Sequence, residues 1–174
     1  MRAAPGWRGA VAETFTVRVQ KEQFTFCAAH FITYEGDKCE RLHGHNYRVA
    51  VELAGPLDQN AYVFDFIALK HLVRQLTEQL DHRMLVPLHN PHFRLEVGEQ
   101  EVVLQYANRQ WRFPRDDCVL LPLGNTTAEL LAKYLAERIR SLLRDKGFLP
   151  YWLRVEIEEA PGQTATYTWT NEDR

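Results

Sequence analysis

The chain has 174 residues, a formal net charge of -2 and a sequence pI near 6.4. This length suits one domain with its own core, and the mixed charges provide no basic stripe for a nucleic-acid groove. No apolar run approaches the roughly twenty residues of a membrane span, and three cysteines at unrelated spacings argue against a disulfide framework, so we expect a cytoplasmic protein without nucleic-acid or membrane partners.

The first third of the chain predicts a tail followed by strands. Residues 1–12 carry Pro, Gly and small residues without periodicity, and we expect a loose tail there. The remainder, 13–174, is expected to form a single domain. Apolar and polar residues alternate over 15–19 and again over 23–32, which indicates strands. The same alternation over 43–53 predicts the next strand.

Two amphipathic helices are predicted from apolar residues at helical spacing. The first follows Asp65, whose carboxylate can accept bonds from the first free amides. The second begins with the capping-box spacing of Thr126 and Glu129 and ends at Gly147.

The remaining segments are strand-like. Short alternating pieces between about 93–121 predict a hairpin excursion, and two last strands follow over 151–160 and 164–169. Strands, helix, excursion, helix and strands in this order indicate an α+β protein whose helices cover one face of a largely antiparallel sheet.

Three histidines lie on the predicted strands with inward parity. Histidines at positions i and i+2 of a strand point to the same face, so His43 and His45 can both reach one ion at about 2.0–2.1 Å. His30 belongs to the preceding strand and has the same inward parity. A single buried histidine is usually a hydrogen-bonded core residue, but three imidazoles without a fourth protein ligand are typical of a catalytic zinc site. We therefore predict a Zn²⁺ site formed by these three residues.

Cys39 precedes the histidine pair in a predicted loop, with Lys38 and Arg41 close by in the sequence. Nearby cations favour the thiolate over the thiol. Cys39 is therefore either a fourth zinc ligand or a reactive base, and periodicity does not separate the two roles because a loop residue can reach either position.

Two further places carry ionisable groups. Asp81 and His82 put a carboxylate beside an imidazole, which supports proton transfer, although a histidine after a helix can instead interact with the terminal carbonyl groups. Glu159 shares the parity of the apolar stripe on its strand. It either faces a ligand with a row of N–H donors or stands where the strand has already reached water.

Six motifs follow one another between Phe24 and Tyr167, namely FCAAH, CERLHGHNY, VFDF, LDHRML, NTTAEL and VEIEEA. With them the sequence resembles the family of 6-pyruvoyl tetrahydropterin synthase and 6-carboxytetrahydropterin synthase. The resemblance implies the tunnelling fold, or T-fold, in which an antiparallel four-stranded sheet carries two helices on one face and the sheets of several chains close into a barrel. It also implies a homo-hexamer (a dimer of trimers) or another homo-oligomer, with active sites between chains.

The resemblance further implies a zinc-dependent lyase whose substrate is a small-molecule pterin triphosphate, 7,8-dihydroneopterin triphosphate. It gives roles to eight residues as zinc ligands, catalytic base, proton relay and pterin anchor. In that order, they are His30, His43 and His45; Cys39; Asp81 and His82; and Glu159 with Thr127.

The position of the cysteine favours one branch of this family. In the carboxy enzymes of queuosine-type deazapurine biosynthesis three residues separate the cysteine from the HGH motif, as they separate Cys39 from His43 here. The expected products are 6-carboxy-5,6,7,8-tetrahydropterin, acetaldehyde and triphosphate. The alternative is the pyruvoyl enzyme of tetrahydrobiopterin biosynthesis. An alternative of another class is a non-enzymatic, zinc-stabilised binding or assembly protein in which Cys39 completes a closed site.

Three features depart from the family pattern. The excursion over about 93–121 is longer than the usual link, Ala160 stands where a threonine often follows the glutamate, and Cys27 replaces a serine or acidic residue beside the first zinc strand. Each of them bears on the pocket or on substrate specificity, and none removes a zinc ligand or the base.

Overall fold

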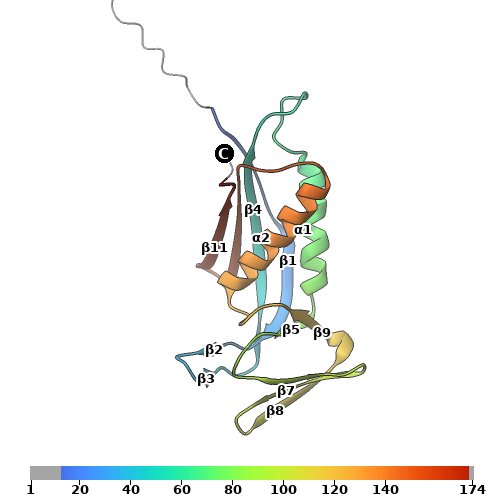
Figure 1. Cartoon of the computed structure of the whole chain (residues 1–174), viewed down its shortest axis with the longest axis vertical. Coiled ribbons are helices and arrows are strands. Elements are labelled where there is room, and N and C mark those ends of the chain that lie inside the picture. The colour runs from blue at the N-terminus through green and yellow to red at the C-terminus, as the bar shows by residue number, and fades with distance from the viewer. Residues whose placement is uncertain (1–12, 173–174) are drawn as a thin grey trace, which may run out of the picture.

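The computed structural model describes residues 13–172, and the tail expected at 1–12 lies outside this range. Within it, a mixed six-stranded sheet carries both α-helices on one face (Figure 1). The strand order is β11-β10-β4-β1-β5-β9. The bounds of these elements, in chain order, are β1 Phe15–His30, β4 His43–Gly55, α1 Phe66–Leu80, β5 Arg83–Pro87, β9 Cys118–Leu121, α2 Ala128–Asp145, β10 Trp152–Ala160 and β11 Gln163–Thr170.

The expectation of four strands is wrong. The antiparallel part, β11-β10-β4-β1, is present, but β5 lies parallel to β1 and β9 lies parallel to β5. Both added strands are short apolar runs, and such runs lack the alternation that identifies a half-exposed strand. β9 forms the end of the segment that the sequence assigned to the excursion. In the single chain this sheet is open, with β11 and β9 at its edges.

A register shift inside β1 determines which of its residues face the helices. Between Gln20 and Thr25, five steps along β1 match two steps along β4. Because the surplus is odd, the side-chain parity of β1 reverses there. Val19 and Phe24 are therefore both buried although they have opposite parity, and the even-numbered face continues inward as far as His30.

The ends of both helices are fixed by side chains or glycine. The carboxylate of Asp65 caps α1, and Gly147 ends α2 with a φ of +76°, both as predicted. The capping box predicted for α2 is wrong, because the cap is Thr127, whose hydroxyl accepts a bond from the Leu130 amide at 3.4 Å. Thr126 is fully buried instead, and its own contacts belong to the site described below.

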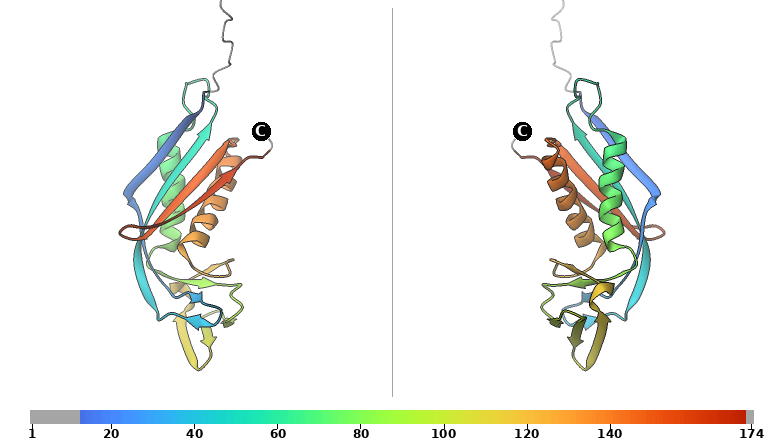
Figure 2. Two further views of the ribbon diagram at one scale, coloured as in Figure 1. Left: turned by 90° about the vertical axis from the view of Figure 1, so that its left-hand side faces the viewer. Right: turned by 90° about the vertical axis from the view of Figure 1, so that its right-hand side faces the viewer.

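The main core lies between the sheet and the two helices, which cover the same face of the sheet (Figure 2). Its helical contribution is the apolar stripe of each helix. In α1 and α2 these buried apolar residues are Leu69, Leu72, Val73, Leu76 and Leu80, and Ala128, Leu131, Ala132, Leu135, Ala136, Ile139 and Leu143. None of the helices between residues 13 and 172 has the length and apolarity needed to cross a membrane.

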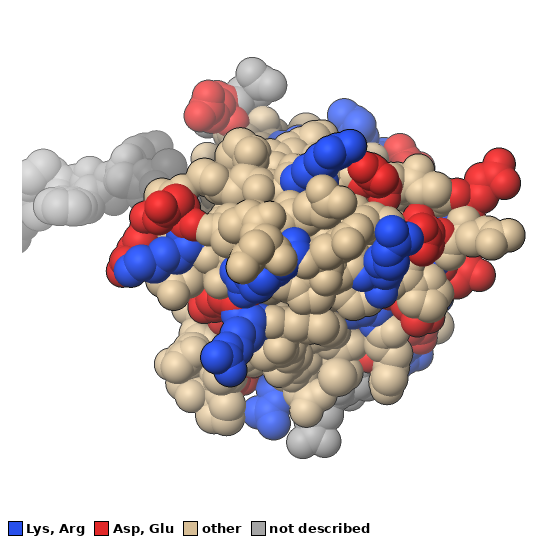
Figure 3. Space-filling model, turned by 90° about the horizontal axis from the view of Figure 1, so that it is seen from below, with Lys and Arg blue, Asp and Glu red and all other residues tan. Residues whose placement is uncertain are grey.

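A second, smaller unit lies at one end of the main sheet (Figure 1). It contains an antiparallel three-stranded sheet, β6-β7-β8, in the segment where the sequence predicted strand-like pieces, and a two-stranded ladder, β2-β3. Seen from this end, Lys and Arg side chains are interspersed with Asp and Glu (Figure 3). The bounds are β2 Thr33–Tyr34, β3 Lys38–Cys39, β6 Arg94–Val97, β7 Glu101–Tyr106 and β8 Arg109–Pro114, and a 3₁₀ turn, η1, spans Arg115–Asp117.

Candidate active site

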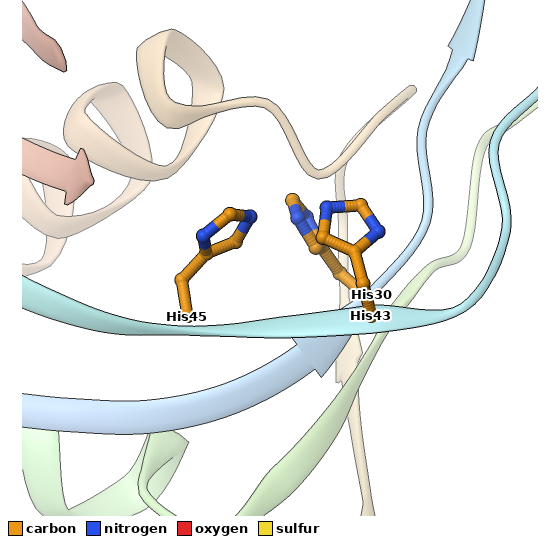
Figure 4. A group of neighbouring side chains, drawn as sticks. All are labelled: His30, His43 and His45. Carbon is orange, nitrogen blue, oxygen red and sulfur yellow. The ribbon is translucent and has the colours of Figure 1, made fainter.

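Three histidines meet where β1 ends and β4 begins. His30 is paired directly across the ladder with His43, and His45 lies two residues further along β4. All three rings project to the same side of these strands (Figure 4). Their closest potential ligand atoms lie within 4.8 Å of one another, so the three imidazoles can hold one metal ion.

Two of the rings are oriented by backbone carbonyl groups. Nδ1 of His30 lies 2.9 Å from the carbonyl oxygen of Thr126, and Nδ1 of His43 lies 2.8 Å from that of Arg41. A neutral ring that donates from Nδ1 keeps the lone pair of Nε2 for a metal. Burial lowers the pKa of His30, which favours this neutral form. The donor set therefore fits zinc, which takes neutral imidazoles at an open site.

The glycine between the two β4 histidines permits a close approach of strands. A Cβ atom at Gly44 would lie 3.1 Å from the carbonyl oxygen of Ala28 on β1. A larger residue there would press the strands apart. Gly44 thus supports the cross-strand placement of His30 and His43.

Glu159 is the carboxylate nearest to this cluster within the described range. Its Oε1 lies 3.5 Å from Nε2 of His30 and 3.7 Å from Nε2 of His45. The hydroxyl of Tyr47 donates to the same oxygen at 3.2 Å. Burial, followed by the charge of Glu159, raises the pKa of Tyr47 well above its usual value, so the hydroxyl remains a donor. Of the two alternatives for Glu159, the structure favours the one that faces a ligand site, because its side chain is only 25% exposed.

The histidines and Glu159 line an open cavity of about 570 Å³, within the range of small-molecule sites. The start of α2 contributes Thr127 and Glu129 to its wall. Sequence reasoning treated Glu129 only as part of a capping box. Because the cap is Thr127 and not Thr126, Glu129 is the second residue after the cap and not the third. Its side chain lines the cavity.

Cys39 is not among the residues that line this cavity, whereas its neighbour Glu40 is. The thiol of Cys39 donates to the carbonyl oxygen of Glu40 at 3.4 Å, and the Glu40 carboxylate lies 3.8 Å from Nε2 of His43. Burial raises the pKa of Cys39, and the cation that opposes this rise is Arg109. The expectation that Lys38 and Arg41 favour the thiolate is therefore wrong.

Asp81 and His82 contact each other but lie outside the cavity of their own chain. Nδ1 of His82 is 2.9 Å from Asp81, and the other carboxylate oxygen of Asp81 accepts the Cys27 amide at 2.7 Å. Burial raises the pKa of Asp81, but the Cys27 amide and His82 outweigh this and leave it below its usual value. His82 is 82% exposed and has a φ of +55°. The pair is thus held at the surface, on the main chain of β1.

The sequence matches the family model described as 6-pyruvoyl tetrahydropterin synthase over residues 18–170. The chain belongs to this family. A relative from Methanocaldococcus jannaschii, named as a putative 6-carboxy-5,6,7,8-tetrahydropterin synthase, is 35% identical over 144 residues, which cover 82% of this chain and 88% of the relative. The 6-carboxy-5,6,7,8-tetrahydropterin synthase of Aquifex aeolicus is 28% identical over 135 residues, 76% of each chain.

Solved structures of this 6-pyruvoyl tetrahydropterin synthase family have the same fold. The Plasmodium vivax enzyme superposes with a TM-score of 0.84 at 29% identity, covering 92% of this chain and all of the other. The Plasmodium falciparum enzyme gives a TM-score of 0.83 at 28% identity with the same coverage. One form of the P. vivax enzyme is described as a catalytic-residue mutant in which a glutamate is replaced by alanine.

Two carboxylates of the site in this chain, Glu40 and Glu129, were not predicted from the sequence. Both line the cavity with the histidines. Glu40 lies in a loop, where no periodicity indicates a direction, and Glu129 was assigned to the helix cap. A sequence signal was nonetheless present, since each is the acidic residue nearest to a motif that the sequence singled out, HGH for Glu40 and the threonine pair for Glu129.

Proposed function

We propose that the chain is a cytoplasmic, zinc-dependent lyase that acts on 7,8-dihydroneopterin triphosphate. With one water, the reaction yields 6-carboxy-5,6,7,8-tetrahydropterin, acetaldehyde and triphosphate, as in queuosine-type biosynthesis. The observation that carries the proposal is the cavity in which three imidazoles and the Glu159 carboxylate converge. Family membership and the relatives named as 6-carboxy-5,6,7,8-tetrahydropterin synthases support this reaction class.

The protein's own groups divide between binding metal and binding substrate. His30, His43 and His45 would hold Zn²⁺, which supplies a Lewis acid for the hydroxyl oxygens of the substrate. Glu159 accepts hydrogen bonds from the ring N–H and amino groups of the pterin, and Thr127 contributes a second polar contact. Such an end-on match orients the carbon that reacts.

Two neighbouring residues compete for the role of catalytic base. Cys39 has the position that the family resemblance assigns to the base, but its thiol packs outside the cavity lining. Glu40 presents its carboxylate to the cavity. A catalytic glutamate in the P. vivax enzyme adds weight to the second candidate. The two single variants Cys39→Ala and Glu40→Gln decide between them. The base removes a proton from a carbon atom of the substrate, and this proton can then exchange with solvent. Only the variant that lacks the base should lose this exchange.

The proposed relay of Asp81 and His82 requires a second copy of the protein. Neither residue lines the cavity of its own chain, so they serve a reaction only if they reach the cavity of a neighbour. The open sheet edges at β11 and β9 support association, since unpaired strand edges favour pairing between chains. We therefore propose a homo-oligomer, such as a hexamer of two trimers, in which the sheets close into a barrel.

The direct test is to incubate the zinc-loaded full-length protein with 7,8-dihydroneopterin triphosphate and to follow pterins by chromatography and acetaldehyde by a coupled dehydrogenase assay. We expect equal amounts of acetaldehyde and carboxylated pterin. Triphosphate release without acetaldehyde would identify the pyruvoyl reaction instead. Intact substrate with fully zinc-loaded protein would contradict both.

The variant Cys39→Ala also distinguishes the lyase from the non-enzymatic alternative, a zinc-stabilised binding or assembly protein. In the described residues the candidate metal group contains the three histidines and no cysteine. We therefore expect Cys39→Ala to retain zinc and fold. Metal loss with unfolding would instead support a closed structural site.

A further inference from the structure

The unit formed by β6, β7 and β8 packs beside the histidine cavity. Its apolar side chains form a second hydrophobic cluster together with Phe31, the residue that follows the zinc ligand candidate His30. The ring of Phe31 stacks on Trp111 of β8 at a centroid distance of 4.6 Å. Cys39 packs against the same cluster. The excursion therefore packs against the sequence neighbours of two residues that line the cavity, His30 and Glu40.

Arg109 is the residue of this unit that reaches the candidate bases. Its guanidinium donates to the carbonyl oxygen of Cys39 at 2.8 Å and to that of Glu40 at 3.1 Å. The rings of Tyr106 and Trp111 lie on either side in sequence, each with its centroid 5.1 Å from the guanidinium carbon. A planar guanidinium held by aromatic rings is well suited to bind two successive carbonyl groups in fixed geometry.

The segment that Arg109 contacts is the second strand of a short ladder, whose first strand is held by hydrogen bonds of Thr33 with Asn125 and Asn90. The β2-β3 ladder has only two residue pairs, Thr33 with Cys39 and Tyr34 with Lys38. An isolated two-stranded hairpin is at best marginally stable in water. Glu40 gains one more backbone bond, from its amide to the carbonyl of residue 32 at 3.0 Å. Besides the contact of the His43 ring with the Arg41 carbonyl, the two bonds from Arg109 are what side chains of other elements contribute to this main chain in the described residues.

We propose that Arg109 is a positioning residue, which fixes the Cys39–Glu40 main chain so that the candidate base stays at the edge of the histidine cavity. The excursion is then the support of the catalytic loop. This inference rests on the proposed lyase function, but the restraint itself does not depend on any substrate.

The test compares Arg109→Ala and Arg109→Lys with a matched control, Arg112→Ala. Arg112 lies on the same strand, and its ion pair with Glu101 is exposed. The first measurement is amide hydrogen exchange of residues 38–42 in the zinc-loaded full-length protein without substrate. We expect exchange to rise about tenfold or more in Arg109→Ala, less in the lysine variant and not at all in the control.

The second measurement separates turnover from binding. In Arg109→Ala we expect kcat to fall about 10- to 100-fold, because small misplacements of a reacting group have effects of this size, while KM and bound zinc stay near the wild-type values. Arg109→Lys should recover part of kcat, since an ammonium keeps the charge but cannot bind both carbonyl groups in the same geometry. Arg112→Ala should leave kcat unchanged.

Each result decides the proposal. Unchanged exchange in Arg109→Ala would show that the segment is fixed without Arg109, and increased exchange with unchanged kcat would show that the restraint does not position the base. If Arg109→Ala does not fold, the lysine variant takes its place, with unchanged kcat again overturning the proposal. If the wild-type protein shows no turnover, the proposed function is wrong. Amide hydrogen exchange in the Arg109 variants would then still decide whether Arg109 restrains the loop.

Discussion

Replacing Tyr47 by Phe removes one oxygen atom from the most enclosed side of the site. The ring is fully buried and stacks on Phe26 at a centroid distance of 4.8 Å, a contact that phenylalanine keeps. What is lost is the bond from the hydroxyl to the carboxylate of Glu159, at 3.2 Å, together with the contacts of the same oxygen with Nε2 and Nδ1 of His30, at 3.2 and 3.3 Å. The substitution therefore removes one hydroxyl and its polar contacts without opening a cavity.

The size of the effect follows from the environment of both partners. Hydrogen bonds to charged groups contribute about 1.5–3 kcal/mol when well protected. The Glu159 side chain is 25% exposed, and water partly replaces a lost donor there. We expect the free energy of unfolding to fall by about 1–2 kcal/mol, which corresponds to a decrease in Tm of about 2–8 °C for a protein of this size.

The assay is thermal unfolding followed by circular dichroism on metal-free protein at one fixed concentration. Tyr62→Phe is the matched control, because its exposed hydroxyl only accepts a long contact of 3.5 Å from Asn60. We expect the control to change Tm by less than about 2 °C, because exposed substitutions usually change the free energy of unfolding by less than about 0.5 kcal/mol. The reasoning fails if both variants unfold at the wild-type temperature, or if both lose the same stability.

Three further outcomes are expected. His45→Ala should lower zinc affinity by about 100-fold or more, measured by metal content after dialysis, whereas His71→Ala on the exposed face of α1 should retain the metal. Leu135→Ala, at a position only 1% exposed, should cost about 2–5 kcal/mol in chemical denaturation, and a smaller loss would mean that the core collapses around the gap. The hydrogen bond from Arg18 holds the pKa of Glu156 below its usual 4.5, so this carboxylate stabilises the fold above that pH and the contribution is lost as the pH falls through the lowered value. Glu156→Gln should therefore be less stable than wild type at pH 7 by up to about 1 kcal/mol, and the gap should close in acid.

The histidine cluster was predictable because strand geometry alone determines it. Side chains two apart on a strand share a face, so His43 and His45 had to point together, and the inward parity of Phe24 and Phe26 extended to His30. The two long helices were predictable for the same reason, from a period of 3.6. The sequence therefore predicts those site residues that lie on a regular strand or helix.

The loop and short-strand contributions could not be predicted in this way. β5 and β9 are largely apolar and too short to display alternation, so the parallel pairing of β5 with β1 and of β9 with β5 emerges only in three dimensions. Arg109 contacts Cys39 and Glu40 across about seventy residues of sequence, and no local pattern links them. The cysteine motif was visible, but no local pattern indicates that its thiol points to the Glu40 carbonyl and away from the cavity.

The one-residue error at the start of α2 has a direct consequence for the metal site. In the structure, the carbonyl of Thr127 accepts the first helical bond, from the amide of Leu131 at 3.0 Å. If the helix began at Thr126, as the capping-box spacing suggested, the carbonyl of Thr126 would accept such a bond instead. That carbonyl is the group to which Nδ1 of His30 is bound at 2.9 Å. The position of the helix cap therefore leaves a free acceptor for the buried ligand, and this acceptor fixes which nitrogen of His30 faces the cavity.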